Sequence, residues 1–253
     1  KWNGYQKGAA NHSCIKIMNI TQQSFIQVTI TLIACILNIH CFTTPLNASM
    51  ALVQTTHGSN ANAMGAAYTA VAKDSESIFY NWAKPKPTPA MDWSLEQATL
   101  METPYYTFSY QHPFNINHLQ LGAIYSAADN IIETELNSNN QPVQTGHTFG
   151  HTLYALHTAY QFPFSIINTG LRYTYFYEKL YTETGQSHQL DLALHKTFST
   201  PLLTLDVGAS IQNLLSSSIT WSTDTTEKVP QLRTIGVATQ LLNNTLILSA
   251  DHS

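Results

Sequence analysis

Charged residues are scarce in this sequence, and long apolar runs are absent after the first fifty residues. Only 10% of the 253 residues are charged, well below the roughly 25% of an ordinary soluble domain. Mean hydropathy is still near neutral at -0.12, because Thr, Ser, Asn, Gln and Tyr replace the missing charges. A membrane-spanning helix needs about twenty nearly continuous apolar residues. The composition therefore argues against helical spans and favours strands with one apolar and one polar face.

Cysteines and basic residues are also few. The three cysteines are Cys14, Cys35 and Cys41, so a chain cleaved near Ala51 would have no thiol. That is in keeping with export through an oxidising compartment without a disulfide framework, although chance would give the same pattern. After Ala51 the chain has 8 basic and 15 acidic residues. An acidic balance argues against nucleic acid as a partner.

The first fifty residues have the order of a secretory signal peptide. Lys16 precedes a mostly apolar run over residues 25–42, and small residues follow it. A basic start, an apolar middle and a small-residue end are typical of a signal that is cleaved on export. We predict that residues 1–51 are an upstream extension and a signal peptide, with Met18 as an alternative start. A lipoprotein signal acylated at Cys35 and a retained helix are the two alternatives.

Residues 52–90 form a distinct N-terminal segment with a proline-rich end. The stretch from His57 to Ala83 is rich in small residues and is predicted to be partly helical. Asp74 is predicted to cap a short helix, because its carboxylate can accept the free amides of a first turn. Three prolines then exclude both helix and central strand. They are Pro85, Pro87 and Pro89.

Residues 91–253 show repeated alternation of apolar and polar side chains. In the stretch 201–214, for example, Leu205 and Val207 alternate with Asp206 and Gly208, as in a strand with one apolar and one wet face. Similar segments separated by short turns and longer loops predict an all-β fold, an antiparallel transmembrane β-barrel. The segment 130–135 is either a further strand or part of a loop. Strands are predicted near 104–112, 117–127, 149–162, 166–178, 187–199, 201–214, 231–241 and 244–252.

Three charged residues inside these strands point away from the apolar side. Arg172, Asp191 and Asp206 each alternate with apolar or aromatic neighbours. A basic residue on the lipid side near mid-membrane costs about 2–4 kcal/mol, and an acidic one costs less. We therefore predict that all three face the lumen. The many tyrosines beside the strands fit a membrane boundary, but tyrosine also simply favours strands.

The segment 63–83 reads AMGAAYTAVAKDSESIFYNWA. It resembles the N-terminal signature of FadL-like outer-membrane barrels, particularly the PorV/PorQ and UPF0164 branch, which runs roughly A-M-G-G-A-Y-T-A-V-A-D-D-A-S-A-I-Y-W-N-P-A-G. A looser similarity begins at residues 211–214 and continues to the strand at 235–238. Trp82 replaces the proline of the family's Asn-Pro-Ala motif, and Lys84 replaces the following glycine.

The resemblance implies a barrel whose N-terminal segment plugs the lumen, with Gly65, Tyr68, Asn81, Trp82 and Ala83 in the plug motif. Many FadL-like proteins transport hydrophobic small molecules such as long-chain fatty acids, whereas the PorV branch serves a protein secretion system. The family has fourteen strands and eight or nine are predicted here, so we expect a partial barrel, incomplete at the C-terminus. The expected location is the bacterial outer membrane. The expected partners are membrane lipid and either a hydrophobic small molecule or secretion-system components.

No residue pattern predicts an enzyme, a cofactor or a metal site. His147 and His151 share a strand face but stand about 13 Å apart at a rise of roughly 3.3 Å per residue, so one metal ion cannot bind both. His188 and Asp191 are neighbours in a strand whose side chains diverge, unlike a preorganised triad. Nucleophile-elbow and phosphate-loop motifs are also missing. A soluble β-sandwich with a binding role is the remaining alternative.

Overall fold

A computed structural model describes residue 53 and residues 55–85, 90–100, 103–114, 117–164, 166–200, 203–241 and 246–253. The predicted signal peptide and most of the proline-rich linker lie outside the described residues. Apart from His252, the described residues fall in one compact unit. None of their helices is long and apolar enough to cross a membrane.

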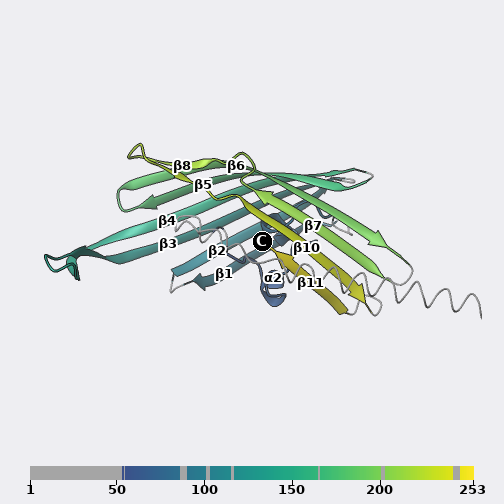
Figure 1. Ribbon diagram of the computed structural model, residues 1–253, viewed down its shortest axis with the longest axis horizontal. Coiled ribbons are helices and arrows are strands. Elements are labelled where there is room, and N and C mark those ends of the chain that lie inside the picture. The colour runs from purple at the N-terminus through teal and green to yellow at the C-terminus, as the bar shows by residue number, and fades with distance from the viewer. Residues whose placement is uncertain are drawn as a thin grey trace, which may run out of the picture. The chain divides into compact units, whose positions relative to one another are not determined.

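One antiparallel sheet of eleven strands dominates the structure (Figure 1), and its main path runs β1-β2-β3-β4-β5-β6-β7-β10-β11. The predicted all-β, antiparallel, barrel-like fold is confirmed. Among the described residues no pairing joins β1 to β11, so this part of the sheet is open. The strands are β1 Asp92–Leu100, β2 Thr103–Phe114, β3 Asn117–Leu136, β4 Pro142–Pro163, β5 Asn168–Leu180, β6 Glu183–Ser199, β7 Thr204–Gln212, β8 Ser218–Trp221, β9 Thr226–Lys228, β10 Leu232–Leu241 and β11 Leu246–His252.

The structure adds strands that the sequence pattern did not predict. β1 was missed, although its alternation is regular, because it follows the prolines. The segment 130–135 belongs to β3, which continues past irregular pairing between residues 128 and 134 into a long hairpin with β4. The stretch between the predicted strands 201–214 and 231–241 contains the small hairpin β8–β9, whose strand β8 pairs with the start of β6.

The two faces of the sheet differ in both chemistry and burial. Along β6 the polar-face positions from Gly185 to His195 are buried, while the alternate positions are half-buried or exposed. We call these the polar face and the apolar face. A soluble sheet buries its apolar side, whereas here the apolar side is exposed. Its exposed members include Trp93, Leu95, Tyr106, Phe108, Leu121, Tyr125, Leu156, Leu171, Tyr173, Phe198 and Ile235.

The N-terminal segment contains two short helices, α2 Ser59–Ala63 and the 3-10 helix η2 Ser75–Phe79. Asp74 is the N-cap residue of η2, but its side chain makes no capping hydrogen bond. The carboxylate instead accepts hydrogen bonds from the Tyr68 hydroxyl and the Asn60 amide. Asp74 therefore stands at the predicted N-cap position but does not make the predicted capping hydrogen bond, since its carboxylate is directed to Tyr68 and Asn60.

Candidate functional site

The contact between residues 57–84 and the polar face of the sheet is the candidate site. The segment has little regular structure, so many of its backbone amides need partners outside it. Carboxylates of the sheet supply several of them. Those of Asp92, Glu96 and Asp251 accept from the amides of Ser75 (3.0 Å), Gly58 (2.7 Å) and Thr69 (2.8 Å).

Arg172 of β5 makes the first of two charged attachments. Its Nε donates to Asp191 Oδ2 at 2.8 Å, and its Nη1 donates to the Ile78 carbonyl at 2.6 Å. The guanidinium carbon also lies 4.1 Å from the ring centroid of Trp82. Asp191 is itself oriented by the Asn213 amide, which donates to Oδ1 at 2.6 Å. The buried Arg172 guanidinium thus connects strands β5 and β6 with η2 and with the turn that follows η2.

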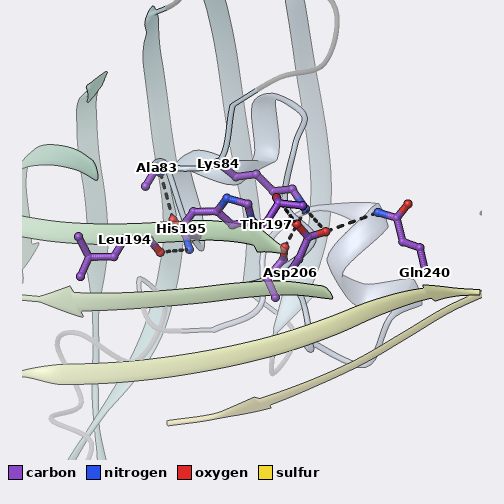
Figure 2. A network of polar contacts seen from close by, with 9 residues as sticks. Ala83, Lys84, Leu194, His195, Thr197, Asp206 and Gln240 are labelled. Carbon is purple, nitrogen blue, oxygen red and sulfur yellow. Dashed lines mark hydrogen bonds and ion pairs between the residues drawn. The ribbon is translucent and has the colours of Figure 1, made fainter. Parts of the chain in front are cut away.

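Lys84 and Asp206 make the second attachment. Lys84 Nζ donates to Asp206 Oδ2 at 2.9 Å and to the Ala70 carbonyl at 2.8 Å. Thr197 Oγ1 donates to the other carboxylate oxygen at 2.6 Å, and Gln240 lies beside the same carboxylate (Figure 2). Burial lowers the pKa of the Lys84 ammonium, and the Asp206 carboxylate opposes that shift. The Asp206 carboxylate therefore stabilises the charged form of a lysine that is largely shielded from water.

Glycines on the polar face let the segment approach the strands closely. A Cβ at Gly208 would lie 2.5 Å from the Thr69 carbonyl oxygen, and one at Gly170 would lie 2.6 Å from the Trp82 ring. Both distances are shorter than real contacts allow. These positions therefore require glycine because another backbone runs directly above the strand.

The residues of the predicted plug motif do not all have the same role. Asn81 donates from Nδ2 to the Leu194 carbonyl at 3.0 Å and accepts from the Ala83 amide at 3.0 Å. Trp82 and Ala83 are fully buried, and Tyr68 is buried with its ring edge against another tyrosine. Gly65 is exposed in a turn at φ 61°, and no heavy atom lies near its Cβ position. Residues 81–83 of the motif contact the sheet, whereas Gly65 only provides the positive φ of a turn.

Two cavities flank the segment. One of about 250 Å³ lies against β7, β10 and β11, with a lining that mixes Thr and Ser hydroxyls with Phe79, Tyr80 and Leu232. The other, of about 290 Å³, lies between α2 and β11 and is bordered by Tyr68 and Ile247. Both are small for a ligand site, which commonly measures about 300–1,000 Å³.

The histidines considered for metal binding are dispersed. His151 Nε2 lies 2.8 Å from Glu178, and His157 Nδ1 lies 2.9 Å from the Thr174 hydroxyl. His147 is exposed near the end of the long hairpin. In the described ranges, no three His, Cys, Asp or Glu residues lie close enough together to hold a metal ion.

Sequence reasoning missed several residues at this contact. Lys84 was noted only as a departure from a family pattern, yet it forms a buried ion pair. The polar-face glycines were also overlooked, although an isolated glycine inside a strand pattern commonly marks close backbone approach. That signal is present at Gly122, Gly170, Gly208 and Gly236.

Comparison with protein-family models, with curated proteins and with solved structures finds no match to this chain.

Proposed function

We propose that this protein is an outer-membrane β-barrel protein whose residues 57–84 form a plug, and that it admits hydrophobic small molecules such as long-chain fatty acids. The observation that carries the proposal is the inverted sheet, with a buried charged face and an exposed apolar face. Lipid chains would cover the apolar face. Only helices or closed β structure satisfy every backbone group inside a bilayer, so in the membrane the sheet would have to close into a barrel.

In the proposed mechanism, the plug blocks bulk flow while small movements open a path beside it. The cavities next to β7, β10 and β11 supply a starting volume, and the aromatic side chains of Phe79 and Tyr80 supply apolar surface. Passage of a long ligand would require these cavities to enlarge. The two charged attachments at Arg172 and Lys84 would set the cost of that movement.

The same attachments favour a second candidate function. A plug joined to the wall through buried ion pairs suits a fixed scaffold better than a moving gate. In that case the protein would be a PorV-like accessory of a protein secretion system. It would co-purify with a secretion translocon, and its loss would leave uptake of hydrophobic molecules unchanged.

Spin labels test the membrane location directly. We suggest single cysteines at Leu156 and Leu171 on the apolar face and at Thr223 in the β8–β9 turn, with the three native cysteines changed to serine. Protein in lipid vesicles should show high oxygen and low nickel-chelate accessibility at the two leucine positions, and the reverse at Thr223. Nickel-chelate access to Leu156 equal to that at Thr223 would contradict a lipid-facing surface.

Uptake of a fluorescent long-chain fatty acid separates the two functions. Lys84→Met should loosen the plug and change the uptake rate, whereas Lys73→Met, an exposed lysine on the same segment, should not. If neither variant nor deletion of residues 65–83 changes uptake, the transport function is wrong. Recovery of translocon proteins with the purified chain would then support the accessory role.

A further inference from the structure

An apolar groove lies on the outside of the sheet, away from the plug. It measures about 450 Å³, and its lining is almost wholly apolar. The groove forms where β5 begins at Asn168 while β6 continues beyond it. Ile166 and Ile167, which precede β5, line one part of it, and residues of β6 and β7 line the rest. The apolar lining residues are Ile166, Ile167, Leu194, Phe198, Val207 and Ala209.

Charge is divided between the two faces in this part of the sheet. The acidic residues of β5, β6 and β7 lie on the polar face, as Asp191 and Asp206 do. The lysines of the same strands, Lys179 and Lys196, belong to the apolar face. Arg172 of β5 lies on the polar face with the acidic residues, so the apolar face of these three strands presents only the two lysines and therefore only positive charge.

Lys196 is the charged residue of the groove. It lies between Leu194 and Phe198 on β6 and opposite Val207 on β7. Its side chain is half-buried, and no carboxylate in the described part of the chain forms an ion pair with it. A lysine stem can lie along apolar neighbours while its ammonium reaches the polar boundary of a membrane. The groove thus combines an apolar trough with a single cation.

We propose that this groove binds an acyl chain of an anionic, phosphate-bearing membrane lipid, and that the Lys196 ammonium pairs with its phosphate. The proposal rests on the proposed membrane location. The groove is continuous with the exposed apolar face that the bilayer would cover, and its volume falls within the usual range of small-molecule sites. An ammonium–phosphate hydrogen bond is charge-assisted and stronger than a neutral one. Both classes of lipid carry a phosphate, but the cation of a zwitterionic headgroup pairs with that phosphate and repels the Lys196 ammonium, so the lysine favours a lipid with net negative charge.

Native mass spectrometry of the full chain in a neutral detergent tests the proposal. Phosphatidylglycerol and phosphatidylcholine with the same acyl chains would be titrated separately. The wild type should retain phosphatidylglycerol more tightly, and Lys196→Gln should weaken that retention about tenfold or more, as loss of a charge-assisted hydrogen bond implies. Lys196→Arg should retain the preference. Ala209→Phe, which fills the groove, should reduce retention of both lipids.

The matched control is Arg233→Gln, because Arg233 is a cation with apolar-face alternation on β10 that does not line the groove. It should behave as the wild type. Equal retention of the two lipids by the wild type, or unchanged retention in both Lys196→Gln and Ala209→Phe, would overturn the proposal. So would displacement of the lipid by inorganic phosphate alone, or a dimer occupying this face. The spin-label result at Leu156 reports the membrane location independently, so the two failures can be told apart.

Discussion

Replacing Lys84 with methionine should release residues 57–84 from the polar face without unfolding the sheet. Methionine keeps most of the apolar stem and removes the ammonium, so as long as the segment stays attached Asp206 is buried without the Lys84 cation. Lys84 and Asp206 side chains are only 10% and 3% exposed. Breaking a buried pair by removing one partner costs about 3–5 kcal/mol, whereas an exposed pair contributes at most about 1 kcal/mol. Thr197 and Gln240 remain beside the carboxylate, so we expect the lower end of the first range.

A double-mutant cycle measures this interaction. Lys84→Met, Asp206→Asn and the double variant would be compared by hydrogen exchange of the amides in residues 57–84. Each single change should increase exchange strongly, and the double variant should be less affected than the sum, with a coupling of about 1–3 kcal/mol. Lys73→Met serves as the control. Additive single effects, each below about 1 kcal/mol, would show that the pair does not hold the segment to the sheet.

Three further predictions concern the same contact. Gly208→Val should detach the segment and expose it to protease near Thr69, while Gly150→Ala, whose nearest neighbour is the movable end of a side chain at 3.0 Å, should not. Burial, and then the neighbouring Asp74 carboxylate, raise the pKa of Glu76 above 4.5. The stabilisation from protonated Glu76 is therefore present below pH 4.5 and is lost as pH rises through the raised pKa. Glu76→Gln should protect the segment's amides from exchange better than the wild type at neutral pH and equally well in acid. Trp82→Ala should lower the unfolding free energy in urea by about 3–5 kcal/mol, and a loss under about 1 kcal/mol would contradict its place in the core.

The alternation of side chains was sufficient to predict most of the sheet. Period two is visible in β5, β6, β7 and β10 because one face is consistently apolar and the other consistently polar. It also predicted the direction of the charged residues, since Asp191 has leucines on both sides in the sequence. Strand ends were less predictable. The extension of β3 beyond residue 128 has exposed residues on both faces, so it carries little burial pattern.

The partners of the charged residues could not be predicted from periodicity. Arg172 and Asp191 lie on adjacent strands in direct register, and that register depends on turn lengths and pairing, which alternation does not give. The contact of Arg172 with Ile78 crosses 94 positions of sequence. The sequence could suggest that a segment covers the polar face, but only the fold shows which charge meets which part of it.

The two departures from the resembled plug pattern explain how the segment is attached. Trp82 stands where proline would be, and it receives the Arg172 guanidinium on its ring. Lys84 stands where glycine would be, and it reaches Asp206. Removing Lys84 would leave the Asp206 carboxylate buried without its lysine partner, whereas removing Trp82 would leave Arg172 still paired with Asp191. Releasing the whole segment would instead return Asp206 to water. The free energy of release therefore limits the cost of any single change at this contact, because the segment will detach before the sheet has to tolerate an unpaired buried charge.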